Sequence, residues 1–213
     1  MNLSVGINTA VILAGGENRR FPMLKSFIEV DGSPIIKRNI CVLKKIFHEV
    51  FINTNMPERY FYIGVPLIGD VLPSRGPMSG IYSSLVNAKE PCIFVTACDM
   101  PFLDKDVITF ICEKHVMVSK SGTVDATIPI FNNEPQPLAG VYSKTILPFL
   151  EEGVLNDKVS LKRLLNDVLV NFIDEADVRA VDPEGRSFIN INTVEDCEKW
   201  FSGHSYNCII NKL

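Results

Sequence analysis

The sequence predicts an α/β protein: a single three-layer α/β/α domain around a mostly parallel, Rossmann-like sheet. Short apolar runs alternate with segments of helical periodicity, the pattern of buried parallel strands joined by crossover helices. Of the 213 residues, 46% are hydrophobic, enough to bury the core of such a domain. No repeat, low-complexity run or Pro/Gly/Ser linker divides the chain. We therefore expect one domain over residues 1–213, with 201–213 as a C-terminal tail.

Apolar, β-branched runs indicate the strands of the first half. They predict strands at 9–13, 49–53 and 92–97. The third run, CIFVTA, has the composition of a central strand. Pro34 suits the first turn of a helix over 34–47, and Gly76-Pro77 opens a helix that extends to residue 87. Residues 57–68 are ambiguous, and we interpret them as a short helix followed by a strand that ends near Asp70.

The second half continues the alternation. Asp104 is expected to cap a helix that extends to residue 115. Further strands are predicted at 126–130, 138–142 and 168–173. Further helices are predicted at 143–151, 160–165 and 193–201. Thr193 and Asp196 form a capping-box pattern at the start of the last helix, with Asp in place of the usual Glu or Gln.

Composition limits the classes of partner. The net charge of −4 argues against general nucleic-acid affinity, so the expected partner is a small anion. Six cysteines without a C-x-x-C pair fit a reducing cytosol. The sequence lacks the pattern of a signal peptide, and no apolar run approaches the roughly 20 residues of a membrane span. We expect a soluble, cytoplasmic protein that binds no membrane.

A glycine pair and three cations follow the first strand. Gly15 and Gly16 can take positive φ and expose backbone N–H groups to phosphate oxygens. Arg19, Arg20 and Lys25 add donors and positive charge. The segment matches neither G-x-x-x-x-G-K-[ST] nor G-x-G-x-x-G. It predicts a phosphate-binding loop, whereas a lone Gly-Gly with nearby arginines is as easily a turn with a solvated basic loop.

Other polar residues also follow predicted strands, where ligands of open α/β sheets bind. Asp99 comes after the CIFVTA strand and offers the hard oxygen that Mg²⁺ prefers; the alternative is a turn residue ahead of Pro101. Asn53, Asn55 and Asp70 could hydrogen-bond a base or ribose, although turn chemistry explains each of them equally well.

A predicted helix start offers a further binding surface. Arg75, Gly76, Pro77 and Gly80 lie where backbone N–H groups and the helix dipole suit an anion or a close-packed nucleotide. The alternative is a plain helix start with Pro at its first position.

Two amides precede the last helix. Asn190 and Asn192 point the same way in an extended segment, so both could face one ligand. The capping box explains Thr193 but leaves the asparagine pair unexplained.

These motifs, in their order, resemble one family. They are ILAGG at 12–16, Lys25, GPMSG at 76–80, ACDMPF at 97–102 and NINTVED at 190–196. Over about residues 9–200 the chain resembles the molybdenum cofactor guanylyltransferase family of the nucleotidyltransferase superfamily. The resemblance implies the fold of the nucleotide-diphospho-sugar transferases. It implies Mg²⁺-dependent transfer of GMP from GTP to molybdopterin bearing molybdenum, with release of pyrophosphate and transient contact with cofactor-insertion proteins.

The resemblance also assigns site residues. It implies nucleotide contacts at Leu13, Ala14, Gly15, Lys25, Asn53 and Asp70. It implies that Asp99 binds the metal and that Asn190 and Asn192 are active-site amides. We hypothesise that Asp99-bound Mg²⁺ holds the phosphates while Lys25 and one of the arginines of the loop stabilise the α-phosphoryl transition state, with no protein nucleophile.

The chain departs from the family pattern in the phosphate loop. The family has Arg-Met-Gly followed by Asp-Lys, whereas here Phe21-Pro22 replaces Met-Gly and Leu24 precedes Lys25. Pro22 is closer to the loop pattern of the wider superfamily. That pattern is equally consistent with a sugar substrate or with cytidylyl transfer. Related cytidylyltransferases resemble L-A-A-G where this chain has Leu13-Ala14-Gly15-Gly16, which favours guanylyl transfer. The alternatives are a cytidylyltransferase or other nucleotidyltransferase with a different phosphorylated acceptor, and a catalytically silent GTP-binding regulator.

Overall fold

The computed structural model describes residues 7–15, 24–73, 76–158, 160–203 and 205–207. Several residues singled out above lie outside these ranges, namely Gly16, Arg19, Arg20, Phe21, Pro22 and Arg75.

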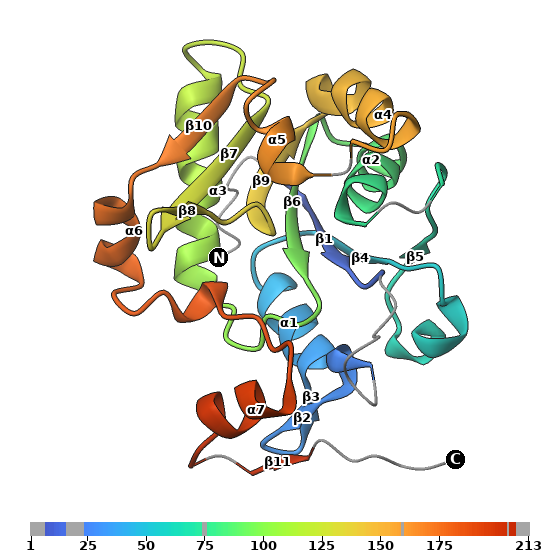
Figure 1. Cartoon of the computed structure of the whole chain (residues 1–213), viewed down its shortest axis with the longest axis vertical. Helices are drawn as coiled ribbons and strands as arrows, with labels where there is room; N and C mark the ends of the chain where they lie inside the picture. The colour runs from blue at the N-terminus through green and yellow to red at the C-terminus, as the bar shows by residue number, and fades with distance from the viewer. Residues whose placement is uncertain (1–6, 16–23, 74–75, 159, 204, 208–213) are drawn as a thin grey trace.

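In the described ranges, an eight-stranded sheet forms the centre of the fold (Figure 1). Its strands are β1 (Thr9–Leu13), β4 (Glu49–Asn53), β5 (Leu67–Ile68), β6 (Cys92–Ala97), β7 (Ala126–Phe131), β8 (Glu134–Pro135), β9 (Ala139–Ser143) and β10 (Val170–Ile173). The order is β10-β7-β9-β6-β1-β4-β5, with β8 paired to β7. β1 is parallel to β4 and β6, β4 to β5, and β7 to β10, whereas β9 is antiparallel to both of its neighbours. The prediction of a mostly parallel sheet is confirmed.

Helices cover both faces of the sheet (Figure 1). They are α1 (Ile35–Leu43), α2 (Pro77–Asn87), α3 (Lys105–Ser119), α4 (Leu147–Leu155), α5 (Leu161–Leu164) and α6 (Glu175–Val181). A further helix, α7 (Val194–Trp200), lies away from this sheet. Successive residues of β1 point to opposite faces, so Ala10 and Ile12 pack in the core under α1, α3 and α6, whereas Val11 and Leu13 pack under α2, α4 and α5. The predicted three-layer α/β/α arrangement is confirmed.

The buried, mostly apolar strands agree best with the sequence. β1, β4 and β6 have the predicted bounds, and α2 begins at Pro77 as expected. The Asp104 carboxylate caps α3 by accepting the backbone N–H groups of Asp106 and Val107. That helix continues to Ser119, four residues beyond the predicted end at 115, although its last buried residue is His115.

Other predicted bounds were less accurate. The predicted helix over 34–47 is shorter, since α1 spans Ile35–Leu43. The ambiguous segment 57–68 contains two 3₁₀ turns, Pro57–Arg59 and Phe61–Ile63, followed by β5.

A small second sheet was not predicted. It joins β2 (Glu29–Val30), β3 (Ser33–Pro34) and β11 (Tyr206–Asn207) in antiparallel pairs. The β2–β3 turn is Asp31-Gly32, both with positive φ, the chemistry of a tight hairpin. α7 packs against this sheet through Cys197 and Phe201. The sheet thereby holds the Asn192 end of α7 beside the main sheet.

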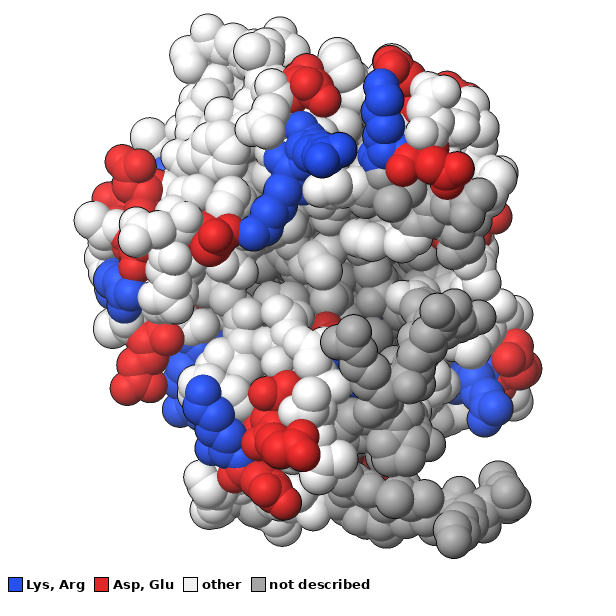
Figure 2. Space-filling view, in the orientation of Figure 1, with Lys and Arg blue, Asp and Glu red and all other residues white. Residues whose placement is uncertain are grey.

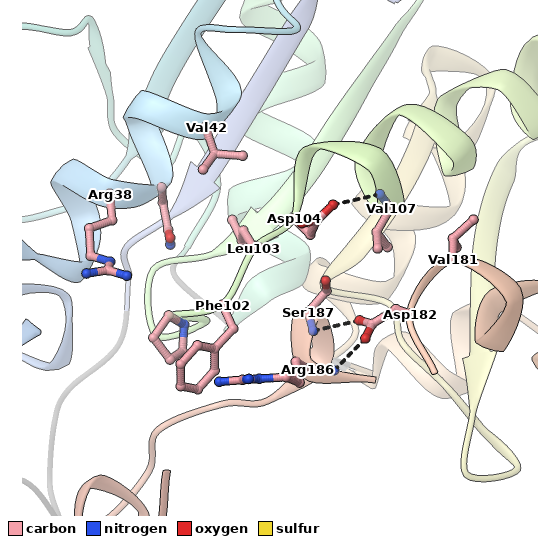
Figure 3. Close-up of a pocket in the computed structure, with 12 residues that line it drawn as sticks. Arg38, Val42, Phe102, Leu103, Asp104, Val107, Val181, Asp182, Arg186 and Ser187 are labelled. Atoms are coloured by element: carbon pink, nitrogen blue, oxygen red, sulfur yellow. Dashed lines mark hydrogen bonds between the residues drawn. The ribbon is translucent and has the colours of Figure 1, made fainter. Parts of the chain in front are cut away.

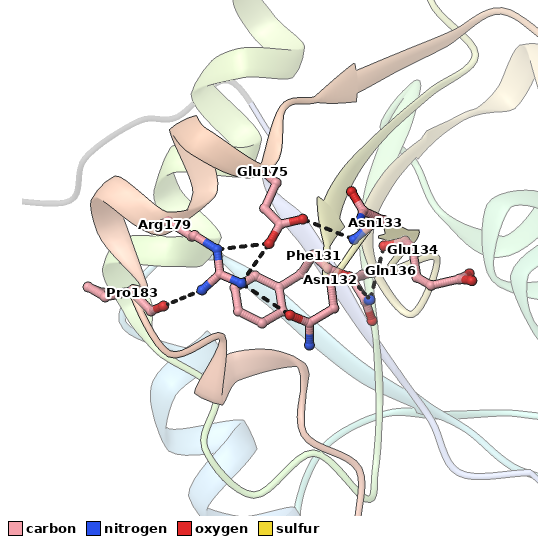
Figure 4. A network of polar contacts seen from close by, with 8 residues as sticks. All are labelled: Phe131, Asn132, Asn133, Glu134, Gln136, Glu175, Arg179 and Pro183. Atoms are coloured by element: carbon pink, nitrogen blue, oxygen red, sulfur yellow. Dashed lines mark hydrogen bonds and ion pairs between the residues drawn. The ribbon is translucent and has the colours of Figure 1, made fainter.

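The helix α6 was also not predicted. A network of polar contacts holds it against the β7–β8 turn (Figure 4). The Arg179 guanidinium donates to Glu175 Oε1 at 2.8 Å, to Asn132 Oδ1 at 3.1 Å and to the Pro183 carbonyl at 2.7 Å. It also lies 4.3 Å from the centroid of the Phe131 ring. These contacts tie α6 and the segment after it to the β7–β8 turn, and so direct the chain toward residues 186–192.

Among the residues drawn in colour in Figure 2, acidic and basic side chains are interspersed and form no continuous basic patch. In the described part of the chain, no helix is long and apolar enough to cross a membrane.

Candidate active site

A pocket of about 230 Å³ opens where β1 and β6 end. Its lining residues are Leu13, Ala14, Gly15, Leu24, Lys25, Ser26, Tyr60, Pro77, Ala97, Cys98, Asp99 and Leu138. Both strands point their carboxyl ends to this edge because they are parallel. Leu13, Ala14, Gly15, Lys25 and Asp99, each predicted as a site residue, therefore line one pocket.

Backbone hydrogen bonds hold the three strand ends together. The Ala14 N–H donates to the Asn53 carbonyl at 2.8 Å, and the Cys98 N–H donates to the Leu13 carbonyl at 3.1 Å. The next residue, Gly15, is exposed, and a Cβ there would meet no atom within 4 Å. It is not among the glycines with positive φ, so the positive φ that glycine permits is not used at Gly15. The open space above it is what a ligand approaching the backbone requires.

Lys25 joins two other predicted residues. It begins a 3₁₀ turn, Lys25–Phe27, and its Nζ lies 2.7 Å from Asn192 Oδ1 and 3.3 Å from Asp99 Oδ2. The Lys25 and Asp99 side chains are only 18% and 17% exposed, so this ion pair is partly shielded from water. The Ile191 N–H donates to the Asp99 carbonyl at 2.9 Å and holds the Asn192 segment against the loop after β6.

The other asparagine lies differently. Asn190 Nδ2 donates to the carbonyl of Phe188 at 3.2 Å, whereas Asn192 contacts Lys25. Of the two amides that were expected to face one ligand, only Asn192 contacts the ammonium group of Lys25.

A second polar cluster lies at the ends of β4 and β5. Asn53 Nδ2 donates to Asp70 Oδ1 at 3.2 Å, and Asn55 Nδ2 donates to Asp70 Oδ2 at 2.8 Å. The Asp70 N–H donates in turn to Asn55 Oδ1 at 2.9 Å. Asn53 and Asp70, both predicted to bind nucleotide, thus hold each other, and Asn55 fixes the carboxylate from the other side.

The start of α2 lies beside this cluster. Gly76 has a φ of 67°, the left-handed region, and Pro77 occupies the first turn and lines the pocket. At Gly80 a Cβ would stand 2.6 Å from Asn53 Oδ1 and 3.0 Å from Leu13 Cδ2. Only glycine lets the helix come this close to the Asn53 amide.

The variant Gly80→Ala should lower the affinity for the nucleotide by about tenfold, because the added methyl displaces the Asn53 amide from Asp70 and weakens the hydrogen bonds offered to the ligand. Isothermal titration with GTP measures it. Gly122→Ala is the matched control, since a Cβ there meets no atom within 4 Å. Unchanged GTP affinity in Gly80→Ala would show that the Asn53–Asp70 pair takes no part in binding.

Sequence reasoning missed the residues that support Lys25. The Ser26 and Tyr60 hydroxyls form a buried hydrogen bond of 2.9 Å, and both residues line the pocket. The Tyr60 ring stacks on Phe27 with centroids 5.2 Å apart. Burial raises the pKa of Tyr60 well above its usual value, so its hydroxyl stays protonated. No local pattern joins residues 34 positions apart, and only the fold brings them together.

Cys98 lies in the pocket without the properties of a nucleophile. Burial and the neighbouring Asp99 carboxylate raise the pKa of its thiol to about 12. The thiol is therefore protonated near neutral pH, whereas the thiolate is the nucleophilic form.

The chain is similar to proteins of one enzyme family. Residues 10–172 match the model of the MobA-like NTP transferase domain. A molybdenum cofactor guanylyltransferase of Desulfosudis oleivorans is 35% identical over 192 residues, covering 90% of this chain and 93% of the relative. A probable molybdenum cofactor guanylyltransferase of Peptoclostridium acidaminophilum is 31% identical over 193 residues, covering 90% and 87%.

A solved structure has the same architecture. Molybdopterin-guanine dinucleotide biosynthesis protein A of Archaeoglobus fulgidus superposes with a TM-score of 0.76 at 26% identity, over 91% of this chain and 97% of that one. The family model covers more than half of the chain, and the relatives match nearly its whole length. The chain belongs to the MobA-like NTP transferase family.

Proposed function

We propose that the protein transfers GMP from GTP to the terminal phosphate of molybdenum-bearing molybdopterin, giving the guanine dinucleotide cofactor and pyrophosphate. Its relatives carry the name molybdenum cofactor guanylyltransferase, and the family is one of nucleotidyltransferases. The observation that carries the proposal is the contact of Lys25 Nζ with both Asp99 and Asn192, beside the end of β1. One cation and one carboxylate thus converge where a nucleotide's phosphates would lie.

The reaction needs no covalent intermediate on the protein. An oxygen of the acceptor phosphate, ionised near neutral pH, forms a bond to the α-phosphorus of GTP. The bond from that phosphorus to the oxygen bridging to the β-phosphate breaks, and pyrophosphate leaves with the electron pair. The protonated Cys98 thiol fits this direct transfer. Catalysis then consists of positioning and charge neutralisation, in which the Lys25 ammonium stabilises the negative charge on the α-phosphoryl oxygens.

The donor set fits Mg²⁺. Lys25 contacts Asp99 Oδ2, and no described residue donates a hydrogen bond to Oδ1. Among the described residues no group of three His, Cys, Asp or Glu side chains could hold a metal. A single carboxylate such as Asp99 is enough for Mg²⁺, which takes one or two protein carboxylates and completes its shell with phosphate oxygens and water. Asp99 would hold the ion, which supplies charge neutralisation for the phosphates.

The nucleoside would lie toward α2. Asn53 and Asp70 present an amide and a carboxylate next to the close approach at Gly80, and carboxylate and amide groups suit the donors and acceptors of a base or ribose. Pro77 and the first turn of α2 form the neighbouring wall of the pocket.

Thermal unfolding with nucleotides tests the choice of base. In the presence of Mg²⁺ and at equal concentration, GTP should raise Tm more than CTP, because the nucleotide with the lower Kd stabilises the folded state more. A ligand at 100 times its Kd stabilises by about 2.7 kcal/mol. A larger shift with CTP would contradict guanylyl transfer and favour the cytidylyl alternative.

Pyrophosphate release separates an enzyme from a silent GTP-binding regulator. With GTP, Mg²⁺ and metal-loaded molybdopterin, one pyrophosphate should appear for each acceptor consumed. GTP binding without release would identify the regulator. The proposal also includes a cytoplasmic location and transient contact with cofactor-insertion proteins, which the family's reaction implies.

A further inference from the structure

The turn that carries Lys25 is weakly held by its own backbone. It is a single 3₁₀ turn, Lys25–Phe27, and no side chain caps its start. Its hydrogen bonds run from the Phe27 N–H to the Leu24 carbonyl at 2.9 Å and from the Ile28 N–H to the Lys25 carbonyl at 3.1 Å. A turn this short is not stable by itself, so the position of the Lys25 ammonium depends on the contacts that surround the turn.

The acceptors of this ammonium are fixed from their own side of the site. Asn192 follows a segment that Asp182 holds in place (Figure 3). The Asp182 carboxylate accepts the N–H groups of Arg186 and Ser187 at 3.0 and 2.9 Å. The Arg186 guanidinium lies 4.7 Å from the centroid of the Phe102 ring, and Figure 3 shows the two groups side by side. These contacts fix the course of the chain toward Asn192.

Further hydrogen bonds hold Asn192 itself. The Asp196 Oδ2 atom accepts the N–H groups of Asn192 and Thr193 at 2.8 and 2.9 Å. One position earlier, the Ile191 N–H donates to the Asp99 carbonyl at 2.9 Å. Asp99 and Asn192 thus belong to one framework. The ammonium needs a support of its own to stay at the oxygens of both residues.

Tyr60 gives the Lys25 turn that support. The Tyr60 hydroxyl forms a hydrogen bond of 2.9 Å with Ser26 Oγ, directly after Lys25 in the chain. The Tyr60 ring stacks on Phe27, the last residue of the turn, with centroids 5.2 Å apart. Ser26 and Tyr60 are each 1% exposed, so their hydrogen bond lies in a low-dielectric environment where it is strong. Tyr60 therefore holds both residues that follow Lys25 in the turn.

The segment that carries Tyr60 is itself tied to the end of β1. The buried Thr54 hydroxyl donates to the Ala14 carbonyl at 3.2 Å. Tyr60 lies between the two 3₁₀ turns of the segment: its N–H donates to the Pro57 carbonyl at 3.0 Å, and its carbonyl accepts the Ile63 N–H at 2.9 Å. The chain between β4 and β5 thus links the wall of the pocket at Ala14 to the wall at the Lys25 turn.

We propose that Tyr60 and Ser26 are positioning residues, whose shared hydrogen bond places the Lys25 ammonium for the phosphoryl transfer. The inference rests on the proposed function and adds two residues to the support of its site. The two hydroxyls are buried and bonded to each other, so they act through Lys25 and not on the substrate. A displacement of about 1 Å in a reacting geometry costs up to about a hundredfold in rate, so loss of this hydrogen bond has a measurable effect.

Rates of guanylyl transfer in Tyr60→Phe, in Ser26→Ala and in the double variant test the proposal. Each single variant should lower kcat at least about tenfold and leave the Kd of GTP within about twofold of the wild-type value. Each also leaves one buried hydroxyl unpaired and should lower Tm. The double variant removes both hydroxyls, so its Tm should recover while its kcat stays low. Recovery of kcat together with Tm would overturn the proposal, because the hydrogen bond would then serve stability alone.

Ser143→Ala is the matched control for the loss of a serine hydroxyl. Ser143 Oγ donates to the Val124 carbonyl at 2.8 Å. Ser143 pairs with Cys92 at the start of β6, whereas the pocket lies beyond the other end of that strand. This variant should keep the wild-type kcat.

A double-mutant cycle separates positioning from general stability. In the Lys25→Met background, Tyr60→Phe should lower kcat no further, because the ammonium through which Tyr60 acts is already gone. A loss of kcat as large as in the wild-type background would overturn the proposal.

The chemical reactivity of Lys25 tests the proposal without the transfer reaction. Brief treatment with acetic anhydride, followed by mass spectrometry of the peptides, gives the acetylation rate of each lysine. The Lys25 side chain is 18% exposed and its Nζ is hydrogen-bonded, so it should react slowly in the wild type. It should react several times faster in Tyr60→Phe and Ser26→Ala. Lys105, whose side chain is 58% exposed, is the internal reference and should react equally in all three proteins.

The two kinds of measurement separate the positioning role from the proposed function. An unchanged acetylation rate of Lys25 in both single variants would overturn the positioning role even if the wild type transfers GMP. Faster acetylation of Lys25 in both variants supports the role. It does so even if the wild type transfers no GMP, in which case the proposed function alone fails.

Discussion

The variant Asp99→Asn should lower kcat for guanylyl transfer about a thousandfold. The amide keeps the shape of the side chain but removes the one carboxylate among the described lining residues of the pocket, and with it the proposed Mg²⁺ ligand. Loss of one electrostatic contact to a transition state costs about a hundredfold to a thousandfold, and loss of the bound ion belongs at the upper end. Single-turnover product formation from GTP and metal-loaded molybdopterin measures the effect.

The fold should tolerate this change. Asp99 is held in place by its own carbonyl, which accepts the Ile191 N–H, so the amide variant keeps the loop conformation. Tm of Asp99→Asn should therefore stay close to the wild-type value. Asp106→Asn is the matched control, because it removes an exposed carboxylate of the neighbouring helix that pairs with Lys105. Full activity in Asp99→Asn would rule out this residue as the metal ligand.

The variant Lys25→Met should lower kcat about a hundredfold or more while changing the Kd of GTP much less. Methionine approximates the length of the lysine stem and deletes the ammonium that contacts Asp99 and Asn192. An interaction used mainly in the transition state affects kcat more than ground-state binding. Pre-steady-state transfer rates, together with titration of GTP, separate the two quantities.

Lys25→Arg and Lys105→Met are the controls for this variant. Arginine keeps the charge and should restore part of the rate, although its planar fork does not reproduce a point charge between two partners. Lys105 is exposed and pairs with Asp106, so its replacement should leave the rate unchanged. Equal losses in kcat and GTP affinity for Lys25→Met would assign Lys25 to ground-state binding instead of the transferred phosphoryl group.

Long buried patterns made much of the fold predictable. β1, β4 and β6 are mostly apolar, are buried along nearly their whole length and lie in the middle of the sheet, so local composition and tertiary environment agree. The β2–β3 hairpin has strands of two residues, too short for any periodicity to appear. The short α6 is fixed by the Arg179 contacts to the β7–β8 turn, and a seven-residue segment gives little helical signal of its own.

The site was predictable only in part, because some of its contacts follow from the strand pattern and others depend on tertiary packing. Parallel strands deliver their carboxyl ends to one edge, so the proximity of Gly15 and Asp99 follows from the strand pattern. The contact between Lys25 and Asn192 spans 167 positions and depends on α7 packing against the small second sheet. The buried hydrogen bond between the Ser26 and Tyr60 hydroxyls joins residues 34 positions apart, and only the fold brings them together.

The central claim is that this chain joins GMP to a phosphorylated pterin at the pocket of Asp99 and Lys25. Mass spectrometry of the products formed from GTP, Mg²⁺ and metal-loaded molybdopterin tests it most directly. The account predicts the molybdopterin guanine dinucleotide together with one equivalent of pyrophosphate, and neither product in Asp99→Asn within the same time. A dinucleotide formed only from CTP, or unreacted GTP beside an intact acceptor, would contradict it.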